Sequence, residues 1–250
     1  MWVLVAGLTV LFLAHTAPFP FLLDRFAPAR SLWHMPRDTS PPTVYLTFDD
    51  GPNPLATPEL LDVLQQTGAR ATFFLIDKHL TVETAAIVRR TFEEGHGVAL
   101  HSDTRVLMFK TPGGLAATLT RQRERIEQLT GGTPCRLFRP HGGWRSVPML
   151  KGLEQIDHQL VGWGFGLWDF NWYRRPDPRA LAARLARRAS PGDIIVMHDG
   201  HHVNPRPDRY YTVEAIRHLV PALRNRSFTF GRLCEPPSED LRDPVAAAEL

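Results

Sequence analysis

Cysteine is scarce in this chain of 250 residues, which contains only Cys135 and Cys234. The two lie far apart and do not form a CxxC pair, which argues against a thiolate metal site or a redox motif. Two interpretations remain open for them: a single disulfide, if the protein is exported, or two separate buried thiols.

An excess of charge of one sign is also missing. The 29 lysines and arginines nearly balance the 26 aspartates and glutamates, which leaves a net charge of +3. Nucleic-acid binders typically carry clustered positive charge, so the composition predicts no nucleic-acid partner. With 43% hydrophobic and 22% charged residues, the chain has the composition of a globular protein rather than a disordered one.

No glycine-rich GxGxxG motif follows the first strand-like run, which argues against a dinucleotide-binding fold. Apolar and β-branched runs instead alternate with helical patterns along the chain. The strand-like runs occupy residues 43–48, 71–76, 97–101, 136–139, 159–165, 193–198 and 228–233. This alternation predicts an α/β fold with a parallel sheet and crossover helices. The number of units favours a closed or nearly closed barrel, and an open doubly wound sheet is the alternative.

Charge is almost absent from residues 1–24, a hydrophobic segment predicted to be helical. The opening run MWVLVAGLTVLFLA is apolar at nearly every position, and the first charged side chain is Asp24. No basic residues precede the run and no clean cleavage site follows it. An uncleaved membrane anchor and an atypical signal peptide therefore both remain open. Either one predicts contact with a membrane and a folded part outside the cytoplasm.

The rest of the chain divides into three parts. Residues 25–40 are linker-like, residues 41–235 carry the alternating pattern of a folded domain, and residues 236–250 resemble a tail.

Titratable and cationic residues collect where the strand-like runs end. The first run is followed by two adjacent carboxylates, and later runs end in or lead to further charged groups. The set is Asp49, Asp50, His101, Arg139, Asp169 and His198. In parallel α/β folds the loops at the carboxyl ends of the strands meet over one face, so these residues are predicted to form one site.

These residue types suit a metal-assisted hydrolase. One carboxylate and an imidazole can hold a divalent cation, and the second carboxylate can take a proton from water. Arg139 is expected to keep that base ionised, and Asp169 is expected to hold the arginine. His198 is expected to donate a proton to the leaving group.

Five short motifs occur in a characteristic order: TFDDG, HSDTR, FRPHGG, LWDFNW and IIVMH. In this order and spacing they resemble the motifs of the polysaccharide deacetylase family, the NodB-homology domain of family 4 carbohydrate esterases. The resemblance covers roughly residues 41–235.

The resemblance implies a distorted (β/α) barrel that removes acetyl groups from N-acetylated sugars with zinc or a similar divalent metal. By position, Asp49 is the catalytic base, and Asp50 and His101 are metal ligands. Arg139 is the orienting arginine, and His198 is the catalytic acid. The leading hypothesis is therefore a metal-dependent deacetylase of an N-acetylated polysaccharide or oligosaccharide.

Substrate-binding groups are expected beside these residues. The backbone N–H at Gly142 is a candidate donor to the oxyanion, because a main-chain donor needs no particular side chain. Trp168 and Trp172 are candidates for stacking against sugar rings.

The second motif departs from the family pattern at Arg105, where the family has a second histidine ligand. An arginine stays protonated and has no lone pair for a metal. Candidate replacement ligands are Asp103, His141, His201 and His202. Arg105 also supports an alternative hypothesis, a non-catalytic saccharide-binding protein that has lost its metal.

Overall fold

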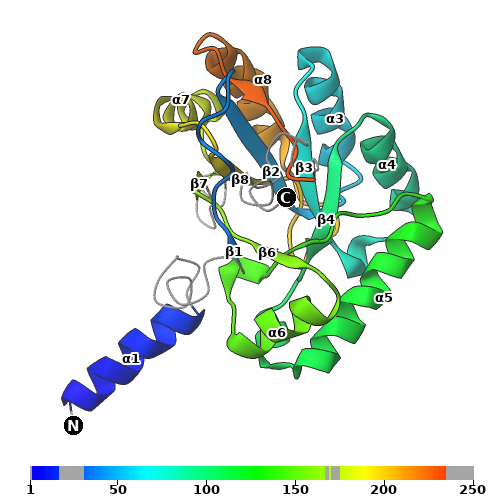
Figure 1. Ribbon diagram of the computed structural model, residues 1–250. Helices are drawn as coiled ribbons and strands as arrows, with labels where there is room; N and C mark the ends of the chain where they lie inside the picture. The colour runs from blue at the N-terminus through cyan, green and yellow to red at the C-terminus, as the bar shows by residue number, and fades with distance from the viewer. Residues whose placement is uncertain (1, 17–30, 167–168, 170–174, 235–250) are drawn as a thin grey trace, which may run out of the picture.

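The fold is built on a sheet of nine strands with helices packed around it (Figure 1). A computed structural model describes residues 2–16, 31–166, 169 and 175–234. The strands are β1 (Ser31–Leu32), β2 (Thr43–Gly51), β3 (Ala71–Ile76), β4 (Gly97–His101), β5 (Leu137–Arg139), β6 (Gln159–Val161), β7 (Phe165–Gly166), β8 (Ile194–His198) and β9 (Thr229–Phe230). The α-helices are α1 (Trp2–Thr16), α3 (Ala56–Thr67), α4 (Val82–Glu93), α5 (Pro112–Thr130), α6 (Val147–Gln155), α7 (Pro178–Arg188) and α8 (Tyr210–Arg224).

The strand order is β1-β6-β5-β4-β3-β2-β8-β7, with β9 added beside β2. Every ladder between these strands is parallel. Parallel neighbours require crossover connections, and α3, α4, α5 and α6 supply them around the curved sheet (Figure 1). The predicted distorted α/β barrel is confirmed.

Local sequence signals set the ends of several helices. Helix α4 begins at a capping box formed by Thr81 and Thr84. The Asp177 side chain accepts a hydrogen bond from the Ala180 N–H at the start of α7. Helix α3 ends at Gly68, whose φ of 59° is accessible to glycine at little cost.

Alternation along β2 separates the two faces of the sheet. Leu46 and Phe48 belong to the large core between the sheet and the helices. Tyr45 points the other way, into a smaller core inside the barrel, here called the interior cluster; its buried members are Tyr45, Phe74, Ala99, Leu137, Val161, Trp163, Ile194, Val196 and Leu233. Side chains on a strand alternate with a period of two, so the interior cluster marks the face from which the site is built.

Two segments differ from the sequence prediction. Residues 31–32, within the predicted linker, form β1 and pair with β6, and the neighbouring Trp33 packs against Trp163 at 6.2 Å between ring centroids. The single strand predicted over 159–165 is two strands, because β6 pairs with β5 whereas β7 pairs with β8. The chain passes between these two parts of the sheet at residues 162–164, which is where the barrel is distorted.

The apolar N-terminal segment forms α1 over residues 2–16, and the described side chains at residues 2–9 are exposed. Within the described ranges, no helix has both the length and the apolar character needed to cross a membrane. Residues 17–24 of the predicted anchor lie outside the described residues.

Of the two interpretations left open for the cysteines, the structure shows the disulfide. Cys135 and Cys234 are bonded, with their Cα atoms 5.7 Å apart and a sequence separation of 99. The bond joins the segment before β5 to the segment after β9.

We expect the double substitution Cys135→Ser and Cys234→Ser to lower the free energy of unfolding by about 2–4 kcal/mol, because the bond closes a long loop in the unfolded chain. Denaturant unfolding of the variant and of the wild type measures the difference. The reduced wild type should unfold like the double variant. Identical midpoints for the oxidised wild type and the variant would contradict the prediction.

Candidate metal centre and active site

Strand alternation directs four of the predicted site residues into the barrel. Each lies two residues beyond an interior residue of its own strand: Asp49 follows Thr47, His101 follows Ala99, Arg139 follows Leu137 and His198 follows Val196. The sheet register places Asp49 opposite His198, and His101 opposite Arg139. All four side chains therefore lie at the carboxyl ends of their strands.

Asp50 reaches the same site through a bulge. Its neighbours Asp49 and Gly51 pair with consecutive residues of β3, which leaves Asp50 as the extra residue of β2. Asp50 has a φ of 69°, a conformation uncommon for residues other than glycine. Adjacent residues of a regular strand point to opposite faces, so the bulge is what brings both carboxylates to one pocket.

Arg139 and Asp49 form a fully buried ion pair. The Nη1 of Arg139 donates to Asp49 Oδ1 at 2.6 Å and to Thr47 Oγ1 at 2.9 Å, and its Nη2 donates to the Gly162 carbonyl at 2.9 Å. The guanidinium also lies over the Phe74 ring, 4.0 Å from the centroid. Because Arg139 has 0% exposure, its charge depends on this carboxylate, and the ion pair holds Asp49 in one orientation.

Asp169 contacts His198, so the prediction that it holds Arg139 is wrong. Asp169 Oδ1 lies 3.1 Å from His198 Nδ1, and both side chains are buried. Burial lowers the pKa of His198, but the charge and hydrogen bond of Asp169, with Asp50 and Asp49 nearby, raise it above its ordinary value overall. This arrangement suits His198 to act as an acid, because the Asp169 carboxylate keeps its ring protonated and oriented.

We expect Asp169→Asn to move the loss of activity at alkaline pH to a lower pH. A catalytic acid works only while it is protonated, so activity falls as the pH rises through its pKa. Removing the carboxylate that raises the pKa of His198 lowers the pH of that fall. The pH dependence of kcat/KM for the two proteins measures it. An alkaline limb that stays in place would contradict the role of Asp169.

Asp50 and His101 have the arrangement of metal ligands. The Nδ1 of His101 lies 2.7 Å from the Arg139 carbonyl and donates to it, which leaves the lone pair on Nε2. That Nε2 is 3.3 Å from Asp50 Oδ1. Donor atoms of one tetrahedral zinc ion, at about 2.0–2.2 Å from it, lie roughly 3.3–3.6 Å apart. Asp50 Oδ1 is buried and makes no hydrogen bond to a described residue, as expected of an atom kept for a cation.

His141 supplies the third donor. Donor atoms of Asp50, His101 and His141 all lie within 4.8 Å of one another. The His141 N–H donates to Ser102 Oγ at 2.8 Å, which ties the histidine to the loop after β4. Burial and the neighbouring His101 lower the pKa of His141 to about 4, so its ring is neutral at pH 7 and has a lone pair to offer.

The carboxylate of Asp50 is anionic under the same conditions. Burial would raise its pKa, but His101, His198 and His141 together hold it well below the usual range. One carboxylate and two imidazoles form a donor set that suits Zn²⁺ and similar divalent ions.

The other candidate replacement ligands have different contacts. Asp103 forms an ion pair with Lys78 at 2.7 Å. The Nδ1 of His201 accepts hydrogen bonds from the N–H groups of Val203 and Asn204, so it caps a turn. His202 lies against the His141 ring, 4.6 Å between centroids, on the side of the pocket.

Arg105 lines the same pocket as the three ligands. Its guanidinium lies over the Trp144 ring, 5.2 Å from the centroid, at the start of the 3-10 helix η3 (Arg105–Phe109). The side chain is exposed, so water screens the repulsion between this arginine and a cation.

A pocket of about 500 Å³ joins these groups. Its lining includes both carboxylates of β2, the histidines 101, 141, 198 and 202, and Gly142. The Gly142 N–H has no hydrogen-bond partner among the described residues, so it fits the predicted oxyanion donor. Trp163 forms part of the wall, whereas Trp168 and Trp172 lie outside the described residues.

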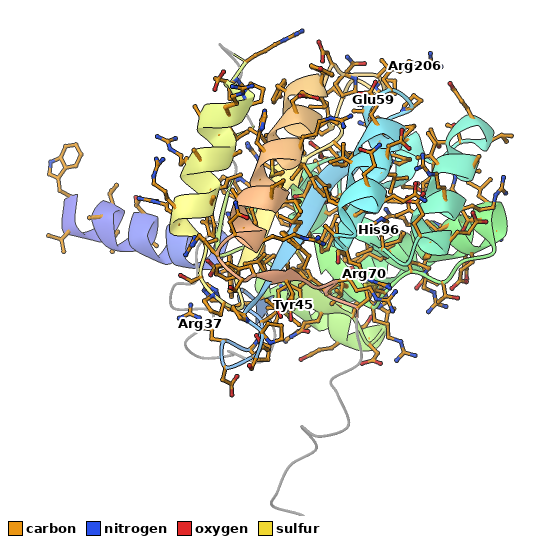
Figure 2. All side chains as sticks on the ribbon, turned by 90° about the horizontal axis from the view of Figure 1, so that it is seen from above. Arg37, Tyr45, Glu59, Arg70, His96 and Arg206 are labelled. Carbon is orange, nitrogen blue, oxygen red and sulfur yellow. A yellow bond between two sulfur atoms is a disulfide. The ribbon has the colours of Figure 1, made fainter. Side chains whose placement is uncertain are left out.

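A larger hollow of about 880 Å³ lies at the opposite end of the strands, beside the starts of β4, β5 and β6. His96, labelled with Arg70 in Figure 2, lines it. Burial and nearby arginines, Arg70 first, lower the pKa of His96 to about 4. None of the predicted site residues lines this hollow, so size alone does not identify the active site.

Sequence analysis missed three groups that position the site. Thr47 and the Gly162 carbonyl hold Arg139, and Ser102 holds His141. Thr47 was detectable, because it lies two residues before Asp49 and so on the same face of the strand. The role of the Gly162 carbonyl could not be predicted from the sequence, because every residue has a backbone carbonyl.

The parallel barrel and the cluster of carboxylates, imidazoles and a buried arginine at its carboxyl rim are those of an α/β-barrel hydrolase. A model of the polysaccharide deacetylase family matches residues 36–161. The chain belongs to this family, as the motif resemblance predicted.

Individual relatives agree with this assignment. The chain is 34% identical to a chitooligosaccharide deacetylase of Sinorhizobium fredii over 76% of this chain and 89% of that protein. The crystal structure of a family 4 acetyl xylan esterase from Clostridium thermocellum, in complex with a cobalt ion, matches with a TM-score of 0.66 and 29% identity, over 76% and 88% of the two chains. A peptidoglycan N-acetylglucosamine deacetylase shares the fold, with a TM-score of 0.71 and 24% identity, over 86% and 95%.

Proposed function

We propose that this protein is a metal-dependent deacetylase that hydrolyses the N-acetyl amide of an N-acetylated polysaccharide or oligosaccharide outside the cytoplasm. The observation that carries the proposal is the cluster of Asp50, His101 and His141 beside the buried pair of Asp49 and Arg139. Ligands for a cation and a carboxylate that can act as a base thus line one pocket.

Each residue of the site has its own step in the proposed hydrolysis. A divalent cation held by the three ligands would polarise the acetamido carbonyl and make water more acidic. Asp49, oriented by Arg139, takes the proton from the attacking water. The Gly142 N–H donates to the oxyanion as the carbonyl becomes tetrahedral. His198, held by Asp169, gives a proton to the departing amine.

Different observations support the proposed substrate class and the proposed location. The similar Sinorhizobium protein is named a chitooligosaccharide deacetylase, and amides of N-acetylated sugars suit the chemistry of this pocket. Disulfides persist mainly in oxidising compartments, so the bond between Cys135 and Cys234 favours an extracytoplasmic location. The apolar N-terminal segment favours the same location.

The alternative of a metal-free saccharide-binding protein depended on Arg105. His141 provides the imidazole that Arg105 does not, so the donor count of three is kept. No other observation in the described residues favours the alternative.

Metal removal and replacement tests the proposal. We expect the purified full chain to bind about one zinc ion, to lose acetate release from N-acetylglucosamine oligosaccharides after chelation, and to recover it when zinc or cobalt is added. Elemental analysis gives the stoichiometry, and an acetate assay gives the rate. Equal rates for the chelated and metal-loaded proteins would refute metal dependence, and no acetate release from the metal-loaded protein would refute the deacetylase.

A further inference from the structure

Arg105 is an unbalanced charge in the lining of the active-site pocket. The pocket is lined by three carboxylates, and each has a partner: Asp49 pairs with Arg139, Asp103 with Lys78, and Asp50 belongs to the metal ligands. Arg105 is the charged lining residue for which the described part of the chain provides no carboxylate. Its guanidinium is therefore available to an anion from outside the protein.

The position of Arg105 is fixed by aromatic contact rather than by an ion pair. Its Cζ lies 5.2 Å from the centroid of the Trp144 ring. A Cβ at Gly142 would lie 3.3 Å from Trp144, so the glycine allows this close approach of the Trp144 ring. A cation–π contact does not use the N–H donors of the guanidinium, which remain for another partner.

The electrostatic balance of the occupied pocket is positive. The pairs Asp49 with Arg139, Asp103 with Lys78 and Asp169 with His198 cancel, one negative charge against one positive in each. A divalent cation against the single charge of Asp50 leaves +1, and Arg105 raises this to +2. A positive cleft raises the local concentration of anionic ligands and disfavours cationic ones.

We infer that Arg105 binds a carboxylate carried by the substrate near its acetamido group, so that the preferred substrates are N-acetylated saccharides with acidic substituents. The inference rests on the proposed function, because it concerns the substrate of the same pocket. A planar guanidinium matches a carboxylate with two parallel N–H donors, which a lysine does not reproduce. Arg105 is thus a specificity residue, whereas the metal is held by the other three side chains.

Two matched probes test the inference: N-acetylglucosamine oligosaccharides that carry carboxymethyl groups, and the same oligosaccharides with neutral carboxamidomethyl groups. Calorimetry on the zinc-loaded full chain gives both affinities, and acetate is measured in the same samples. We expect the wild type to bind the charged probe about fivefold more tightly at low salt, the range of an exposed ion pair, and to lose the preference at high salt.

Two substitutions assign the preference to Arg105. Arg105→Gln should abolish it while leaving the zinc content and the affinity for the neutral probe unchanged, and Arg105→Lys should keep part of it. Equal affinities of the wild type for the two probes would overturn the inference. A preference that persists in Arg105→Gln, or a loss of zinc from that variant, would also overturn it.

The same measurements can refute the proposed function and the anion site independently of each other. If the wild type releases no acetate from either probe but shows the Arg105-dependent preference in binding, the deacetylase proposal fails and the anion site stands. If acetate is released equally from both probes and binding shows no preference, the deacetylase stands and the anion site fails.

Discussion

His141→Ala is expected to lower the affinity for zinc by roughly 100-fold or more and to remove acetate release at ordinary zinc concentrations. The substitution deletes one of three protein ligands, a larger loss than the 10–100-fold cost of removing a group that only orients a ligand. The ring of His141 is neutral at pH 7, because burial and His101 lower its pKa to about 4, so it loses no proton on binding the metal. Competition with a chromophoric chelator measures the affinity.

His202→Ala is the matched control for this prediction. The His202 ring lies 4.6 Å from the His141 ring and lines the same pocket, but His202 is not among the three residues whose donor atoms converge. We expect it to retain zinc. If the two variants lose zinc equally, or only the His202 variant loses it, the assignment of the third ligand is wrong.

Asp49→Asn is expected to lower kcat by about 10²–10⁴-fold, because the amide cannot accept the proton that the carboxylate takes from water. It should also lower the free energy of unfolding by about 3 kcal/mol, because it leaves the fully buried Arg139 without its charged partner. Zinc binding should persist, since Asp50 and the two histidines are unchanged. Steady-state kinetics, denaturant unfolding and metal analysis measure the three quantities.

Thr47→Val separates the effect of Asp49→Asn on kcat from its effect on stability. It removes a neutral hydrogen bond from Arg139 Nη1 but leaves the ion pair with Asp49. We expect a loss of stability of about 1–2 kcal/mol and a much smaller loss of rate. If Asp49→Asn kept the wild-type kcat, Asp49 would not be the base, whatever its effect on stability.

Much of the architecture was predictable because its causes are local. Strands β3 and β4 have the predicted bounds, since apolar runs bounded by polar turns identify buried strands. Side chains alternate between the two faces of a strand. Once the inner face of each strand is known, this alternation predicts that four side chains point inward: Asp49, His101, Arg139 and His198. The motif order then predicted the family, which the family model confirms.

The sequence by itself determined the parallel alternation of strands and helices, the end of the sheet that carries the charged groups, and the family. The tertiary structure alone decided that His141 joins Asp50 and His101, that Asp169 contacts His198 rather than Arg139, and that the cysteines pair. The physical reason is the separation in sequence over which each effect acts. Periodicity and capping act within a few residues, whereas these contacts join groups about 30 to 100 positions apart, whose distance depends on the curvature of the whole sheet and on the bulge at Asp50.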